Sequence, residues 1–157
     1  ASIIGRSPIP TQQVVLIDRG GQHGIELGSV AVDAFGIVGR VIEHAAWHSS
    51  VMLITDFDSR IAAYLERSRE NGLLVGLGQG KCELLYLDAN ATVALGERVM
   101  TAGFGGPFPK GLLLGTVTKI QRDELRGVTR AVVQPAASLH RLEEIYCFAP
   151  ENVVTVM

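Results

Sequence analysis

The stretch Thr101-Ala102-Gly103-Phe104-Gly105-Gly106-Pro107-Phe108-Pro109-Lys110-Gly111-Leu112 is dense in glycine and proline. Glycine tolerates positive φ and proline lacks a backbone donor, so the stretch forms neither a helix nor a central strand. It predicts a structured turn between strands at 98–101 and 113–120, with Gly106 and Gly111 at positive φ. Gly111 and a strand-like run follow Lys110, where a phosphate-binding loop needs Ser or Thr and a helix. The pattern therefore argues against nucleotide binding.

The composition is that of a folded, turn-rich protein. Apolar residues make up 47% of the 157 positions, charged residues 19% and aromatic residues 6%, and there are 18 glycines. These values indicate a packed core and favour an all-β fold. The net charge is −2 and no basic patch stands out, so we expect no nucleic-acid partner. No apolar run reaches the roughly 18 residues of a membrane span. The chain begins at Ala1, without Met, and we expect it to be a fragment of a longer protein.

Strand-like runs recur at the spacing of about 8–12 residues that is typical of sandwiches and barrels. Turn clusters such as Asp56-Phe57-Asp58-Ser59 separate them. Asn71-Gly72 predicts a type I′ hairpin turn, because both residues tolerate positive φ. One or two helical turns are expected over 137–144, with Ser138 as the N-cap. The predicted strands are 14–17, 36–42, 51–55, 60–66, 73–77, 84–87, 98–101, 113–121, 129–134 and 145–148.

The chain also repeats itself. In each copy a Leu-Gly turn introduces a strand, and a strand of the pattern Gly-x-x-(x)-Gly-x-Val follows after a loop. The repeat predicts two β modules of like architecture, each closing a small core. We place the first module at residues 1–70 and the second at 71–157. The paired segments are 25–30 with 93–99, 36–41 with 111–117, and 51–55 with 131–135.

No catalytic or metal-binding constellation emerges. Neither a Gly-Asp-Ser-Gly nor a Gly-x-Ser-x-Gly nucleophile turn occurs. His44 and His48 are spaced for a metal site only on a helix, but they lie between two strands without a close third ligand. Ser49 and Ser50 follow His48 directly, which rarely makes a nucleophile–base pair. The remaining candidates have simpler interpretations: His23 and His140 as loop residues, Asp56 and Asp58 as turn formers, and Trp47 as a packing residue.

Cys82 and Cys147 match no zinc spacing, and two buried free thiols are favoured over a disulfide. We therefore predict no catalytic residue, no metal and no cofactor for this chain.

The opening stretch resembles the Thr-Ser-Gly-x-Gly-Gly-x-Phe-Pro-x-Gly-Leu stretch of the family of rod shape-determining protein MreC, with Ala102 where Ser is common. Further matches follow in register and cover nearly the whole chain, at 17–20 with 24–28, 36–41, 53–60 and 139–144. The resemblance implies two small β-barrel modules in tandem, in a chymotrypsin-like arrangement without a triad.

The resemblance also implies a function. The chain would be the periplasmic or extracellular region of a protein anchored in the inner membrane by an N-terminal helix absent from this fragment. It would act as a non-catalytic scaffold of the cell-elongation machinery. The implied partners are a class B penicillin-binding protein (a transpeptidase), RodA and MreD, with MreB reached indirectly and with self-association.

Phe104 and Phe108 are the candidate partner-binding residues, with core or inter-barrel packing as the alternative. Two other functions stay open at this point. A divergent chymotrypsin-like serine hydrolase would need His and Ser in hydrogen-bond contact. A glycan-binding module would need several exposed aromatic residues on one face. We expect the isolated fragment to self-associate only weakly.

Overall fold

The computed structural model describes residues 1–104 and 106–150. Within them the regular elements are strands, apart from two short 3₁₀ helices, η1 and η2. The predicted all-β class is therefore confirmed. The elements are β1 (Ile3–Arg6), β2 (Val14–Ile17), η1 (Gly21–His23), β3 (Val30–Val32), β4 (Ile37–His44), β5 (Ser49–Leu53), β6 (Arg60–Leu65), β7 (Asn71–Gly76), β8 (Cys82–Asp88), β9 (Arg98–Thr101), β10 (Leu113–Asp123), β11 (Val128–Pro135), η2 (Leu139–Arg141) and β12 (Tyr146–Phe148).

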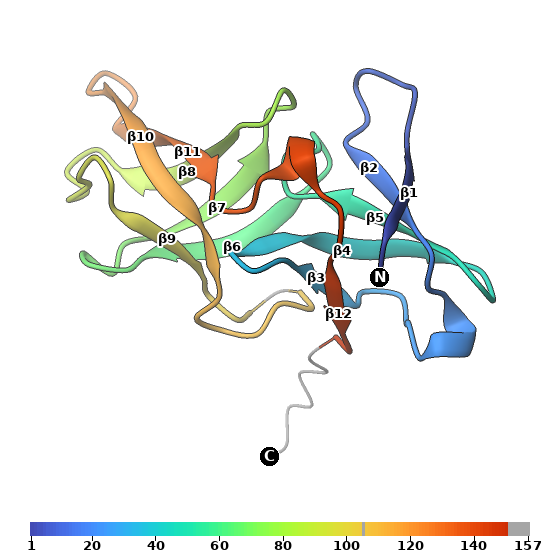
Figure 1. The fold of residues 1–157 in the computed structure, drawn as a ribbon. Helices are drawn as coiled ribbons and strands as arrows, with labels where there is room; N and C mark the ends of the chain where they lie inside the picture. Colours follow the sequence, from blue (N-terminus) through green and yellow to red (C-terminus); the bar gives the residue numbers. More distant parts are fainter. Residues whose placement is uncertain (105, 151–157) are drawn as a thin grey trace, which may run out of the picture.

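The strands form two units that lie side by side (Figure 1). One is a closed barrel with the order β10-β11-β8-β7-β6-β9, and the other is a six-stranded sheet with the order β1-β2-β5-β4-β3-β12. The sheet curves back on itself, because Ser2 forms a β-bridge with Glu144 just before β12. Ala1 and Ile145 exchange two backbone hydrogen bonds of 2.8 and 2.9 Å at the same place. The tandem arrangement of two barrel-like modules is thus confirmed in outline.

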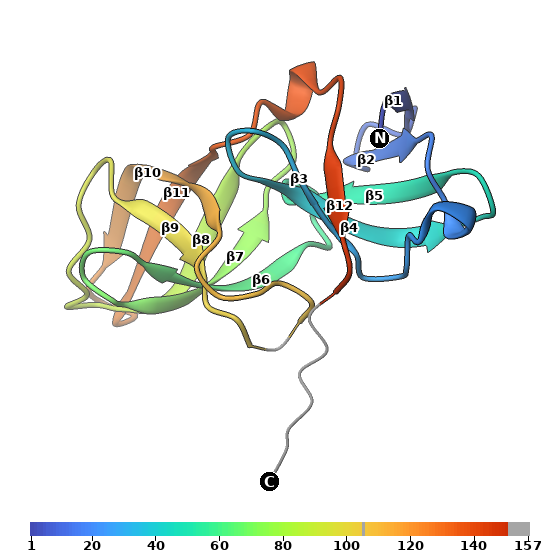
Figure 2. The same ribbon diagram turned by 60° about the horizontal axis from the view of Figure 1, so that its bottom comes forward.

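The strand pairing divides the chain differently from the predicted boundary at 70/71. The change from sheet to barrel falls between β5 and β6, and β12 returns from the end of the chain to pair with β3. Figure 2 shows β12 running beside β3 at the edge of the first sheet. Turn signals mark where a strand ends but not which sheet it joins. That residues 1–70 and 71–157 are separate folding modules stays a prediction.

The predicted hairpin turn at Asn71-Gly72 is wrong, because both residues belong to β7. The β6–β7 turn lies just before them, and Arg69 adopts a positive φ of 66° there. Gly72 is needed for a different reason. A Cβ at this position would lie 2.7 Å from the carbonyl oxygen of Leu85 on the neighbouring strand. The glycine therefore permits close packing inside the barrel wall.

The repeated segments adopt the same local structure in the two units, which confirms the repeat. Gly28 and Gly96 both have positive φ, of 83° and 82°. Their amides donate to the carbonyl oxygens of Val41 and Val117, at 2.9 and 2.7 Å. The amides of the same two valines donate back to the residue after each glycine, at 2.9 Å in both copies. The Leu-Gly turn and the following strand are therefore held together identically in the sheet and in the barrel.

The second glycine of each repeat is required for the same reason in both units. Gly39 in β4 and Gly115 in β10 face a neighbouring strand so closely that a Cβ would overlap its backbone. The overlapping atoms would be the carbonyl oxygens of Met52 and Gln134. The glycine of the Gly-x-Val pattern therefore permits a close approach of two strand backbones in both units.

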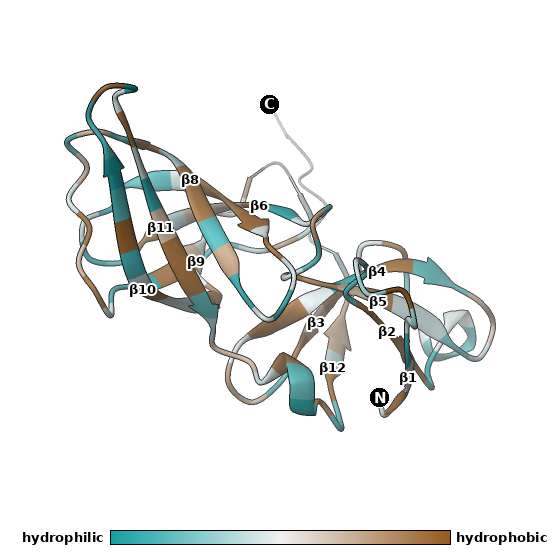
Figure 3. Cartoon of the chain, turned by 90° about the horizontal axis from the view of Figure 1, so that it is seen from above, coloured by the Kyte–Doolittle hydropathy of each residue, from teal (hydrophilic) through white to brown (hydrophobic). Residues whose placement is uncertain are grey.

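One hydrophobic core cluster includes residues of both units, among them Ile17, Val41 and Leu53 from the sheet and Leu84 and Leu114 from the barrel. Figure 3 shows hydrophobic residues along the strands, alternating with hydrophilic ones on β8 and β10. In place of the predicted turns over 137–144 the structure has the short η2, for which Ser138 is the N-cap residue without a side-chain hydrogen bond.

Candidate interaction surfaces

The β9–β10 connection is the glycine-rich stretch, and Thr101 holds its base together. Thr101 is fully buried, and its hydroxyl donates to the carbonyl oxygen of Pro109 at 2.6 Å and accepts from the amide of Leu112 at 2.8 Å. The two ends of the connection are also joined by two backbone hydrogen bonds. The amide of Thr101 donates to the carbonyl oxygen of Leu112, and the amide of Gly111 donates to that of Thr101. The predicted structured turn between two strands is confirmed.

The glycines of this connection differ in their backbone φ angles. Gly111 has a φ of 89°, as predicted. Gly106 does not lie at positive φ, so that prediction is wrong. Gly103 takes this role instead, with a φ of 82°, and a Cβ there would lie 2.7 Å from the Cβ of Lys110. Composition alone identifies a glycine turn but not which glycine carries the unusual dihedral.

We expect Gly103→Val and Gly111→Val each to lower the free energy of unfolding by about 1–3 kcal/mol, because a β-branched residue at positive φ is strained. Gly106→Val serves as the matched control and should change it by less than about 0.5 kcal/mol, since no atom lies within 4 Å of its added Cβ. Chemical denaturation measures all three variants. Equal effects at the three positions would contradict the assigned dihedrals.

The two phenylalanines have opposite environments. Phe108 is 6% exposed and belongs to the core cluster, whereas Phe104 is 61% exposed. Only Phe104 therefore offers apolar surface to a partner. The same connection also reaches the first sheet, because a Cβ on Gly28 would lie 3.7 Å from Pro107 and 3.5 Å from Pro150. Phe104 thus projects from a connection that contacts both units.

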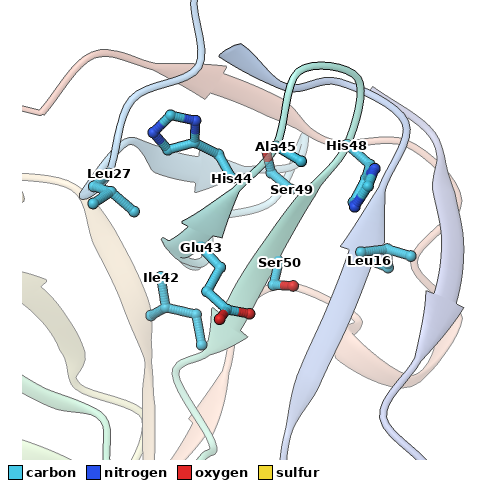
Figure 4. Close-up of a pocket in the computed structure, with 9 residues that line it drawn as sticks. All are labelled: Leu16, Leu27, Ile42, Glu43, His44, Ala45, His48, Ser49 and Ser50. Carbon is cyan, nitrogen blue, oxygen red and sulfur yellow. The ribbon is translucent and has the colours of Figure 1, made fainter.

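A pocket of about 480 Å³ lies on the outer face of the first sheet. Figure 4 shows its lining side chains, with His44 at the end of β4, His48 in the β4–β5 turn and Ser50 on β5. The two histidines stand on opposite sides of the pocket. The hydroxyl of Ser49 donates to the carbonyl oxygen of Arg19 at 2.7 Å. Among residues 1–104 and 106–150, no hydrogen bond joins a serine hydroxyl to a histidine, so this pocket holds no nucleophile–base pair.

The remaining candidate side chains have structural partners. The carboxylate of Asp56 accepts from the amides of Gln13 and Asp58, each at 2.8 Å, and so stabilises the turn. The ring of Trp47 packs edge-on against His23, with 5.7 Å between centroids. In the described part of the chain, no cluster of His, Cys, Asp or Glu is suited to hold a metal ion.

Exposed aromatic side chains lie on several elements of the fold. Tyr146 and Phe148 share β12, and Phe35 lines one pocket with Tyr146, but the other four lie on connections or strands elsewhere in the fold, which does not favour a single glycan-binding platform. The exposed aromatic residues are Phe35, Trp47, Phe57, Tyr86, Phe104, Tyr146 and Phe148.

Both cysteines are free, as predicted, but only Cys82 is fully buried, so the predicted burial is wrong for Cys147. Cys82 is fully buried, and burial raises the pKa of its thiol to about 12. Cys147 is half-buried in β12, and burial raises the pKa of its thiol as well. Neither thiol has the lowered pKa of a reactive cysteine.

The sequence pattern of the family described as "Rod shape-determining protein MreC, barrel core" matches residues 3–149. The chain belongs to the MreC family. A curated relative, the cell shape-determining protein MreC of Cereibacter sphaeroides, is 36% identical over 141 residues, which is 90% of this chain and 45% of the relative.

The crystal structure of MreC from Pseudomonas aeruginosa has the same fold. It superposes with a TM-score of 0.90 at 28% identity, covering 94% of this chain and 96% of that one. A structure described as a complex between penicillin-binding protein PBP2 and MreC from Helicobacter pylori also matches, with a TM-score of 0.70 over 96% of each chain. At 17% identity that likeness shows the fold alone.

This MreC-family chain spans only about a third to a half of the length of the curated relatives it matches. No helix within residues 1–104 and 106–150 has the length and hydrophobicity needed to cross a membrane.

Proposed function

We propose that this chain is the extracytoplasmic part of a non-catalytic scaffold that binds a class B penicillin-binding protein. By holding that transpeptidase in place, the scaffold organises peptidoglycan synthesis during cell elongation and maintains rod shape. RodA and MreD are further partners, and MreB is reached indirectly. The observation that carries the proposal is the match of nearly the whole chain to the MreC barrel core. The H. pylori complex supports the choice of a penicillin-binding protein as partner.

The scaffold acts on the outer face of the cytoplasmic membrane, where it is anchored by an N-terminal helix that precedes this fragment. Membership of the MreC family supports this placement, and the curated relatives are long enough to supply such a segment. The fragment self-associates only weakly by itself. Among the described residues, β12 pairs only with β3, so its other edge could offer a strand to a second copy, whereas the start of β1 is already paired with residues 143–145.

Phe104 is the proposed partner contact, because it is the exposed member of the pair in the glycine-rich connection. We expect Phe104→Ser to weaken binding to the periplasmic domain of the cognate class B penicillin-binding protein about tenfold, as for an aromatic anchor at an interface. Titration calorimetry measures the affinity. Leu125→Ser is the control, since Leu125 is fully exposed at the β10–β11 hairpin. Equal affinities for both variants would place the contact elsewhere.

The proposal also predicts that no serine is activated as a nucleophile. We expect a broad serine-directed fluorophosphonate probe to leave the folded chain unlabelled, because Ser49 is buried and bonded to Arg19. Mass spectrometry of the intact protein reads the result. Stoichiometric labelling of one serine that disappears in His44→Ala or His48→Ala would contradict the scaffold and favour a hydrolase.

A further inference from the structure

A cleft of about 420 Å³ opens where the two units meet, on a different side from the β9–β10 connection. Its walls come from the end of β1, the residue before β2, the β7–β8 turn, the end of β11 and η2. In Figure 1 these segments gather at the upper side, with η2 between the β7–β8 turn and the β1–β2 connection. Neither unit forms this cleft alone.

The ionisable side chains that line the cleft are all basic. Arg6, Lys81 and His140 contribute to the lining, and no Asp or Glu does. In the described part of the chain, none of these three side chains forms a salt bridge. The guanidinium of Arg6 donates to the carbonyl oxygen of Leu139 at 2.8 Å. This bond fixes the group across the cleft and leaves most of its five N–H donors for a ligand.

The carboxylate of Asp56, which is bonded to a residue of the lining, does not neutralise Arg6 or Lys81. Asp56 is buried, and its two oxygens accept from the backbone amides of Gln13 and Asp58 at 2.8 Å. The carboxylate is thus bound to peptide groups and not to Lys81 or Arg6. The cleft therefore presents unpaired positive charge on an otherwise slightly acidic chain of net charge −2.

Three amide side chains, of Gln13, Gln79 and Gln134, line the same cleft. Each amide both donates and accepts hydrogen bonds, as a peptide group does, whereas a phosphate mainly accepts. Gln79 is held in the left-handed region at φ 49°, between Gly78 and Gly80. The amide of Gly78 donates to the carbonyl oxygen of Thr55 at 2.7 Å, which anchors this turn against the first sheet.

We infer that this cleft binds an extended acidic peptide segment of a protein partner. Arg6 and Lys81 pair with its carboxylates, and the glutamine amides bond its peptide groups. The side-chain oxygen of Gln13 already accepts from the hydroxyl of Thr55 at 3.5 Å, whereas a peptide can donate to the oxygens of Gln79 and Gln134 and a fully ionised phosphate cannot. The site is separate from Phe104 and does not depend on the proposed contact with a penicillin-binding protein.

The test titrates the isotope-labelled 157-residue chain with end-blocked hexaglutamate in about 20 mM salt, where charge attraction is weakly screened. Amide chemical shifts should move around residues 78–81 and 138–141, and hexaglutamine should move them far less. Lys81→Glu should weaken hexaglutamate binding at least about tenfold. Lys119→Glu is the matched control, because Lys119 is exposed on β10 outside the cleft and the charge change is the same. It should change the affinity less than about twofold.

Thermal melts establish that Lys81→Glu and Lys119→Glu are folded. Arg6→Gln removes a second positive charge from the cleft and should also weaken hexaglutamate binding. Equal weakening by Lys81→Glu and Lys119→Glu, or shifts spread over the whole surface, would overturn the proposal in favour of nonspecific charge attraction. Inorganic phosphate or phosphatidylglycerol vesicles that bind through Lys81 while hexaglutamate does not would overturn the peptide as the ligand. The affinity of Phe104→Ser for the penicillin-binding protein is measured separately. That affinity tests the proposed function and not the peptide-binding cleft.

Discussion

Replacing Gly39 by valine is expected to lower the free energy of unfolding by about 4 kcal/mol, among the largest effects of a single substitution. Gly39 lies in β4, between β3 and β5, and is buried. Its added Cβ would overlap the carbonyl oxygen of Met52, which is part of the backbone and cannot rotate away. The strands must separate to make room, and the hydrogen bonds between β4 and β5 are lost with them.

For a chain of this size, about 4 kcal/mol corresponds to a fall in Tm of about 8–16 °C. Circular dichroism melts and urea denaturation measure it, and soluble expression reports the most severe outcome. Gly106→Val is the matched control, because the same substitution there meets no atom within 4 Å. A Tm for Gly39→Val within about 2 °C of the parent would contradict the close approach of β4 and β5. Gly115→Val should behave like Gly39→Val, since its Cβ would overlap the carbonyl oxygen of Gln134.

Replacing Ile145 by alanine is expected to cost about 3 kcal/mol, although the residue lies near the end of the chain. Ile145 is fully buried, and its backbone exchanges hydrogen bonds with Ala1 just before β12. The lost side chain leaves a cavity in the first sheet and weakens the contact that brings β12 back to β3. Leu125→Ala is the control, because Leu125 is fully exposed and its removal should cost less than about 0.5 kcal/mol.

Hydrogen exchange shows where the destabilisation acts. In Ile145→Ala, amides of β3 and β12 should exchange faster, while those of β7 and β8 in the barrel should change less. Faster exchange of the barrel alone would favour the predicted module 71–157, which includes Ile145. Faster exchange of the first sheet would favour the division given by strand pairing, in which the end of the chain belongs to the sheet.

The candidate sites were accessible to sequence reasoning to different degrees. The glycine-rich connection was predictable because its residues are contiguous and their backbone preferences are local. Whether Phe104 or Phe108 faces solvent depended on packing against the core, which no local preference encodes. The basic cleft carried no linear signal at all, because Arg6, Lys81 and His140 are far apart along the chain and meet only in the fold.

Sequence by itself determined the all-β class, most of the strands, the repeat and the family. These follow from short-range physics: alternating side chains, glycine and proline dihedrals, and motifs that keep their order. The short strands β1 and β3 were not predicted from the sequence. Tertiary structure alone decided which sheet each strand joins, the return of β12 to β3, and the reason for Gly72. Pairing partners and close backbone approaches are contacts between distant residues, and their free energy depends on the whole fold and not on any local segment.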